Sequence, residues 1–121
     1  MTQLFAVAGG GAVGAGLRFA LCDMTQRLLG RDLPYDTLLV NILGAFLIGV
    51  LAGGDALPAW LHTGMIVGVL GRFTTFSAFS WETMSLASAG MSARAATNVF
   101  ANVFLSLTAG WAGLALRMAV H

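Results

Sequence analysis

The sequence predicts an all-α membrane protein with four transmembrane helices. Hydrophobic residues make up 58% of the 121 residues and charged residues only 9%, whereas a soluble domain carries about 25% charged residues. The apolar residues form four segments, and each approaches the roughly 20 residues that a membrane-spanning helix needs. We therefore expect a single transmembrane domain over residues 1–121, with spans at about 3–28, 34–54, 62–88 and 94–119.

Several classes of protein do not fit this composition. The formal net charge is +1, so the basic surface of a nucleic-acid-binding protein is missing. A lone cysteine, Cys22, excludes an intrachain disulfide and a cysteine-only metal site. No nucleophile, base and orienting residue form an obvious set, so we do not expect an enzyme. The first apolar run continues into Arg18 without a cleavage site, and we interpret it as a span and not as a signal peptide.

The first span is rich in glycine and contains an arginine well inside its apolar segment. Gly10 and Gly14 form a GxxxG pair, which lets helix backbones approach closely in lipid. Arg18 lies deep enough in this span to attract an anion or anchor a loop, or else to reach the interface or pair with an acid. The GxxxG spacing recurs at Gly49–Gly53 and Gly64–Gly68.

The second span has one strongly polar side chain in its apolar part. Pro34 and Asp36 suit the start of a helix. Asn41 follows one to two turns later, and an amide there must find a partner. It either makes an interhelical hydrogen bond or donates to a water-filled path.

The third span carries the densest polar stretch, residues 71–82. Arg72 and Glu82 flank four hydroxyl groups at depths where hydrocarbon is expected. Polar groups in that position indicate a functional site by default, although isolated hydroxyls can simply bond their own helix carbonyls. The number of polar residues in this short stretch favours a functional site. The hydroxyls belong to Thr74, Thr75, Ser77 and Ser80.

The fourth span has a polar row. Asn98, Asn102, Ser106 and Gly110 follow at four-residue spacing, which places them on one helical face. Such a ladder of donors suits a polar track, and a polar dimer seam is the competing interpretation.

The arginines at or beyond the ends of the spans set only a weak orientation bias. With four spans, Arg27, Arg31 and Arg94 flank one side and Arg117 the other. Three against one is a small difference for the positive-inside rule. Insertion in both orientations is therefore compatible with the sequence.

The embedded polar groups are mostly hydrogen-bond donors, which indicates an anion as the transported species. Amides, hydroxyls and guanidinium groups can replace an anion's hydration shell, and phenylalanine ring edges are electropositive. If Thr74–Ser77 breaks the helix, the freed N–H groups add anion donors and the freed carbonyls can hold a cation.

These motifs resemble the Fluc/CrcB fluoride channel family over essentially the whole chain. The first-span start, the second-span block and the fourth-span row match in order, and the third-span motif is highly specific. The resemblance implies a broken third helix and an antiparallel, dual-topology homodimer that exports fluoride passively across the bacterial inner membrane. The matching segments are Gly14-Ala15-x-x-Arg18, Thr37-Leu38-x-Val40-Asn41-x-x-Gly44 and Gly71-x-Phe73-Thr74-Thr75-Phe76-Ser77-Ala78-Phe79-Ser80-x-Glu82.

The resemblance also implies roles for individual residues. Carbonyls of Gly71 and Thr74 would hold a structural sodium ion at the dimer interface. Arg72 departs from the family, which usually has a second glycine there, and its charge would repel that ion unless it points away or pairs with an acid. The pore and fluoride-binding candidates are Phe76, Phe79, Asn41, Asn98, Asn102, Ser106, Thr37, Thr75, Ser77, Arg18 and Glu82.

Two other functions compete with the channel. A small four-helix proton-coupled multidrug exporter needs an embedded carboxylate, which in that family lies in the first span. Here the first span has only Asp23, near its end, and Glu82 lies in the third. A non-transporting, holin-like assembly would explain the glycines but not the polar row.

Overall fold

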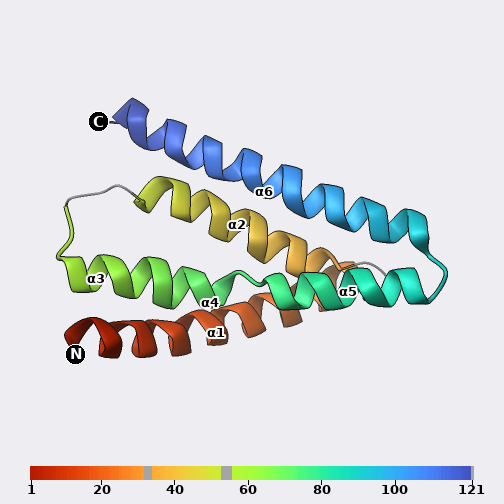
Figure 1. Cartoon of the computed structure of the whole chain (residues 1–121), viewed down its shortest axis with the longest axis horizontal. Helices are drawn as coiled ribbons and strands as arrows, with labels where there is room; N and C mark the ends of the chain where they lie inside the picture. The colour runs from red at the N-terminus through yellow and green to blue at the C-terminus, as the bar shows by residue number, and fades with distance from the viewer. Residues whose placement is uncertain (32–33, 53–55, 121) are drawn as a thin grey trace.

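The computed structural model describes residues 1–31, 34–52 and 56–120, and every regular element in these ranges is a helix. Figure 1 shows them as long rods joined by short connections, with the start of α1 and the end of α6 at the same end of the molecule. The all-helical prediction is therefore confirmed. The elements are α1 (Thr2–Leu29), α2 (Tyr35–Leu51), α3 (Ala59–Thr63), the π-helix η1 (Gly64–Leu70), α4 (Gly71–Phe73), α5 (Phe76–Ser88) and α6 (Ser92–Val120).

The helix bounds lie close to the expected spans. By length and composition α1 and α6 are able to cross a membrane, and α2 is a shorter apolar helix. The third rod begins at Ala59 and not at the expected residue 62, because Pro58 caps it and proline favours a helix start. The expected end of the second span at 54 lies outside the described residues.

The third rod consists of four consecutive pieces. In Figure 1, α3, η1 and α4 continue one another and α5 follows after a short extended link. The sequence analysis did not predict the π-helix. Single π-helical turns inside α-helices are often found at functional sites, and η1 ends where the polar stretch begins.

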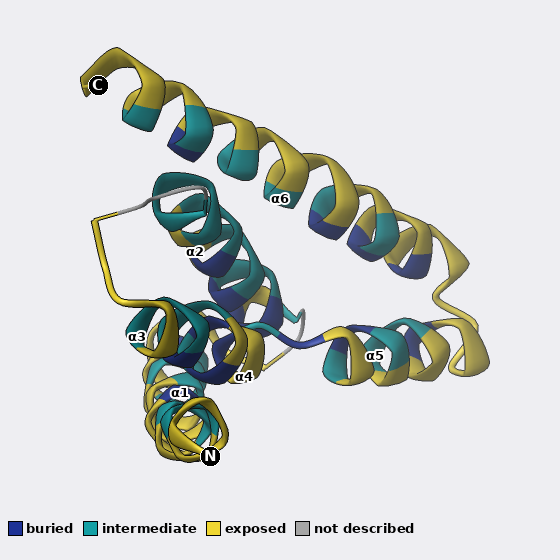
Figure 2. Cartoon of the chain, turned by 60° about the vertical axis from the view of Figure 1, so that its left-hand side comes forward, coloured by how far each residue is buried: buried dark blue, intermediate teal, exposed yellow. Residues whose placement is uncertain are grey.

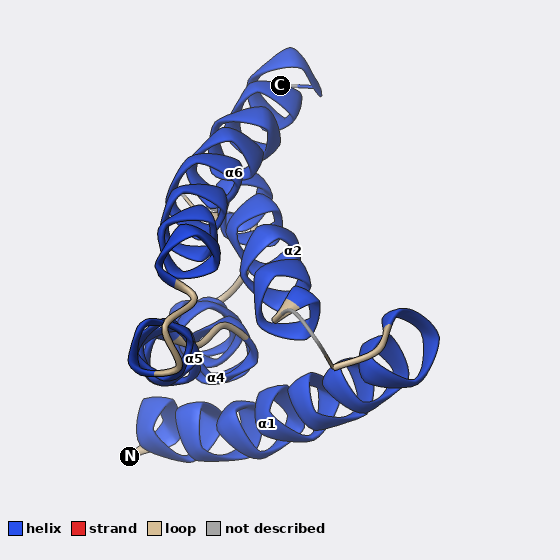
Figure 3. Ribbon diagram, turned by 90° about the vertical axis from the view of Figure 1, so that its right-hand side faces the viewer, coloured by secondary structure: helices blue, strands red, loops and turns tan. Residues whose placement is uncertain are grey.

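The rods form two pairs. α1 packs along α3, η1 and α4, whereas α2 packs along α6, and α5 extends the third rod onto α6. Figure 3 shows α1 beside α4 on one side and the α2–α6 pair on the other.

Glycines make both pairs tight, as the sequence predicts. A Cβ atom at Gly10 or Gly14 would collide with the backbone of η1, and one at Gly68 would lie 2.9 Å from the Val7 carbonyl oxygen. Gly49 packs in the same way against α6 at Gly110. Its expected partner Gly53 lies outside the described residues.

The molecule is apolar outside and partly polar inside. Large apolar side chains are exposed along the rods, among them Phe5 and Trp111, and Figure 2 shows a continuous exposed face along α6. By contrast, Thr37, Asn98 and Asn102 are buried. This distribution fits a chain surrounded by lipid, whose polar groups must be satisfied internally.

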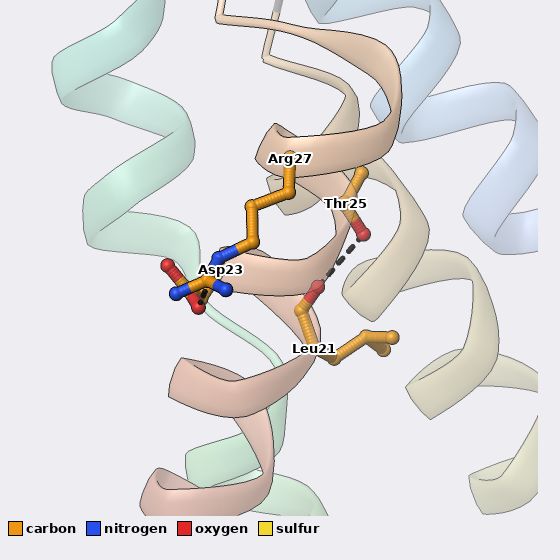
Figure 4. Close-up of polar contacts among 4 residues, drawn as sticks. All are labelled: Leu21, Asp23, Thr25 and Arg27. Atoms are coloured by element: carbon orange, nitrogen blue, oxygen red, sulfur yellow. Dashed lines mark hydrogen bonds and ion pairs between the residues drawn. The ribbon is translucent and has the colours of Figure 1, made fainter.

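The last turns of α1 carry exposed charge. Arg27 pairs with Asp23 at 3.0 Å, and the Thr25 hydroxyl donates to the Leu21 carbonyl at 2.8 Å (Figure 4). Both contacts are local to the helix, so they support its end without connecting it to the rest of the fold.

Candidate ion pathway at the helix break

The third rod is interrupted at Thr74 and Thr75. Both residues have extended backbone, with φ −81° and ψ 157° at Thr74 and φ −148° and ψ 125° at Thr75. Thr74 still closes the first half, because its N–H and its hydroxyl each donate to the Leu70 carbonyl at 3.0 Å. The break that the family resemblance implies is therefore present, and it leaves backbone groups on both sides without intrahelical partners.

Asn41 satisfies the backbone at the break. The Thr75 N–H donates to Asn41 Oδ1 at 2.9 Å, and Asn41 Nδ2 donates to the Thr75 carbonyl at 3.2 Å. A side-chain amide offers the same donor and acceptor as a peptide group. Asn41 thus pairs with Thr75 as a neighbouring strand would, and holds the extended link against α2.

A chain of amides continues from this pair into α6 and α5. Asn41 Nδ2 also donates to Asn102 Oδ1 at 3.0 Å, and Asn102 Nδ2 donates to the Asn98 side-chain and backbone oxygens at 3.0 and 2.9 Å. Asn98 Nδ2 donates to the Thr83 hydroxyl at 2.9 Å. The polar row of α6 therefore faces α2 and α5.

Asn41 makes the interhelical hydrogen bond that is one of its two interpretations. Both of its amide hydrogens are donated to protein oxygens, so the interhelical hydrogen bond is observed. The donors left over lie farther along: one amide hydrogen of Asn98 and the buried Ser106 hydroxyl have no partner among the described residues. Unpaired buried donors cost free energy unless a ligand or water meets them.

Aromatic rings and a cap mark the start of α5. The Thr75 hydroxyl accepts from the Ala78 N–H at 3.1 Å and lies 3.3 Å from the Ser77 hydroxyl. Phe79 is buried, whereas Phe76 is 77% exposed, and their ring centroids are 5.4 Å apart in an edge-to-face arrangement. Ring edges are electropositive and suit an anion.

Glu82 lies one turn farther along α5, against α2. Its Oε1 accepts from the Thr37 hydroxyl at 2.6 Å, and its buried Oε2 has no partner among the described residues. Glu82 also lines a pocket of about 210 Å³ together with Arg31 and Trp81. The structure therefore brings Thr37 and Glu82 together, separately from the amide chain.

The remaining candidates surround a larger hollow on the α1 side of the break. This hollow has a volume of about 430 Å³, and Arg18 and Arg72 contribute its charged groups. Gly71, Thr74, Phe76 and Ser77 also line it. Among the described residues neither Arg18 nor Arg72 forms an ion pair with an acid, which is one of the alternatives that the sequence leaves open for each.

Sequence reasoning missed two polar contributors. Thr83 accepts from the Asn98 amide and lies just beyond the polar stretch 71–82. Arg117 donates to the Val50, Leu51 and Ala52 carbonyls at 3.2, 3.4 and 3.1 Å, and so caps the end of α2. A hydroxyl group in an apolar segment is a pattern that could have indicated Thr83. No pattern in the sequence indicated the contacts of Arg117.

Comparison with known proteins finds a matching family and several similar proteins. Residues 5–114 match the family described as CrcB-like protein, Camphor Resistance (CrcB). A Geobacter sulfurreducens protein is 42% identical over 94% of this chain and 95% of its own length, and an Aeromonas salmonicida protein is 40% identical over 95% and 94%. A Methylococcus capsulatus protein is 46% identical over 98% of this chain, which spans only 54% of that relative. All three are named fluoride-specific ion channel FluC.

Proposed function

Because this chain belongs to the CrcB family, we propose that it is a fluoride-selective channel that exports fluoride passively and lowers its cytoplasmic concentration. The structural observation that carries the proposal is the polar face between α2, α5 and α6. There a buried hydroxyl at Ser106 and an amide hydrogen at Asn98 lack partners among the described residues. An anion that gives up its hydration water would supply the acceptor that these two donors lack.

The proposed pathway uses donors and ring edges in sequence. Phe76 and Phe79 would present electropositive edges at the start of α5, and Asn98 and Ser106 would donate hydrogen bonds deeper in the protein. Asn41 and Asn102 would keep the path open by fixing the break. The flanking groups would be Thr37, Thr75, Ser77, Arg18 and Glu82.

We extend the proposal to an antiparallel homodimer in the bacterial inner membrane. The exposed, largely apolar faces of α1 and α6 support a multi-pass protein in lipid. The hollow beside the break contains Arg18 and Arg72 about halfway along the rods. Charged groups at that depth are costly in contact with lipid, which supports a second copy or water against this face.

We also propose a structural sodium ion at the break, and the backbone there supports the proposal. The Thr75 N–H, which would return to the Gly71 carbonyl in an uninterrupted helix, donates to Asn41 instead. Carbonyls freed in this way are sodium ligands in other membrane proteins. Gly71 and Thr74 from two antiparallel copies would hold the ion, which would tie the copies together. Arg72 leans toward α1, because its Cγ lies 3.4 Å from the position of a Cβ on Gly11.

Ion efflux from liposomes tests the channel. Purified protein is reconstituted into vesicles loaded with potassium fluoride or potassium chloride, a potassium carrier is added, and external halide is recorded with an electrode. Fast fluoride release with little chloride release supports the proposal. Fluoride release no faster than from protein-free vesicles would refute the channel. Proton-driven uptake of an organic cation would indicate the exporter instead.

Cysteine labelling and size-exclusion chromatography test the assembly separately. A single cysteine is introduced at the C-terminal end of α6 in a Cys22→Ser background, and labelling from each side of the membrane reports orientation. Equal labelling from both sides is expected for a dual-topology protein. Replacing sodium by a bulky organic cation should weaken the dimer measured by size-exclusion chromatography, and an unchanged dimer would contradict the sodium site.

A further inference from the structure

A small pocket lies between the starts of α2 and α6, at the opposite end of the molecule from the chain termini (Figure 1). Its volume is about 120 Å³. Tyr35 lines it from α2, and Arg94, Thr97 and Asn98 line it from α6. The pocket shares no lining residue with the hollow beside the helix break, so it is a separate feature of the surface.

Asn98 connects this pocket to the buried amide chain. Its side chain is only 6% exposed. One of its amide hydrogens is donated to the Thr83 hydroxyl, and the other has no partner among the described residues. A buried donor without a partner costs free energy unless a ligand or water meets it. Because Asn98 lines the pocket, an anion or a water molecule there can supply that acceptor.

The charge around the pocket favours anions. Arg94 is exposed and forms no ion pair with a described residue, and its Nη1 donates only to the Met91 sulfur, a weak acceptor, at 3.7 Å. No acidic side chain is among the described residues that line the pocket. The positive dipole ends of α2 and α6 also lie here. Asp36, in the first turn of α2, accepts from Gln26 of α1 and lines a different pocket.

We propose that this pocket is the mouth through which fluoride enters the polar row of α6, and that Arg94 is a positioning residue that concentrates anions there. The proposal rests on the proposed function. Arg94 precedes Asn98 by four residues, which places the two on one helical face with Cβ atoms about 5–6 Å apart.

The size of the pocket and the exposure of Arg94 suit transit through a mouth. A water molecule needs about 10–15 Å³ of such volume, so about 120 Å³ accommodates a small anion with part of its hydration shell. An exposed guanidinium group keeps its own hydration and acts through its field, which raises the local anion concentration without holding the ion tightly.

Charge-selective thiol modification measures the potential in the pocket without depending on conduction. Thr97→Cys in a Cys22→Ser background places a thiol there, and the Thr97 hydroxyl that is lost bonds only the Ala93 carbonyl of its own helix. The full chain in phospholipid nanodiscs is treated with an anionic or a cationic methanethiosulfonate reagent at low salt. A unit charge about 7 Å away in water changes each rate about threefold in opposite directions, so Arg94→Gln should lower the anionic-to-cationic rate ratio about tenfold.

Three controls separate this field from other effects of the substitution. Arg94→Lys keeps the charge and should keep the wild-type ratio. Salt at about 1 M should remove most of the difference between wild type and Arg94→Gln, because screening then acts within about 3 Å. Arg27→Gln is the matched control: Arg27 lies at the same end of the molecule, outside the pocket and paired with Asp23, and its loss should change the ratio less than about twofold.

Fluoride efflux from liposomes then tests whether ions enter through this pocket. Arg94→Gln should slow efflux about threefold at low salt and much less at about 1 M. An unchanged rate ratio in Arg94→Gln, an equal fall in Arg27→Gln, or a Thr97→Cys thiol that neither reagent reaches would overturn the proposal, as would wild-type efflux in Arg94→Gln. Absence of fluoride release from wild type would refute the channel itself, and the rate ratio would still decide whether Arg94 concentrates anions in the pocket.

Discussion

Replacing Asn41 by leucine removes the side chain that satisfies the helix break while roughly keeping its volume. Three hydrogen bonds disappear, at 2.9, 3.2 and 3.0 Å, and the partners left behind are the Thr75 N–H, the Thr75 carbonyl and Asn102 Oδ1. A typical protein hydrogen bond contributes about 1 kcal/mol, and interhelical bonds in membranes average about 0.6 kcal/mol. We therefore expect the free energy of unfolding to fall by about 2–3 kcal/mol.

Reversible denaturation in mixed micelles measures this change, with tryptophan fluorescence as the signal. Trp81 lies on α5 close to the break and should report its loss. Ser106→Ala is the matched control, because its hydroxyl has no partner among the described residues. A loss below about 0.5 kcal/mol for Asn41→Leu, within the range of an ordinary surface substitution, would show that the Asn41 contacts do not hold the break.

Three other substitutions follow from the same structure. Ser106→Ala should change the free energy of unfolding by no more than about 0.5 kcal/mol but slow fluoride efflux from liposomes, because its hydroxyl has no partner among the described residues and would donate only to the proposed ion. Phe79→Ile should slow efflux while leaving the dimer intact on size-exclusion chromatography, since it removes the ring edge next to Phe76. Arg117→Leu should lower the free energy of unfolding by about 1 kcal/mol, because it uncaps the end of α2.

Each of these has an outcome that contradicts it. Wild-type efflux in Ser106→Ala would remove the hydroxyl from the path. Wild-type efflux in Phe79→Ile would assign the ring to packing alone. An unchanged free energy of unfolding in Arg117→Leu would show that Arg117 does not stabilise the end of α2. Arg117→Lys is the control, because it keeps the charge at the helix end and so separates the charge from the guanidinium hydrogen bonds.

Local patterns in the sequence predicted much of this molecule. Segment length and composition gave the helical rods, because a lipid-facing helix must be apolar over its own length. GxxxG spacing predicted that Gly10 and Gly14 allow another helix to approach closely, and the structure shows that this helix is η1. The four-residue spacing of Asn98, Asn102 and Ser106 placed them on one face, because that repeat is a property of a single helix.

The partners of those residues were decided only by the tertiary structure. The residue spacing in α2 does not predict that Asn41 bonds to Thr75 or that Thr37 bonds to Glu82. These contacts join segments far apart in the chain. The same holds for Arg117, which the sequence presented as a flanking charge and the fold places on the carbonyls of α2. Periodicity fixes which side chains share a face, whereas the packing of the rods determines what that face meets.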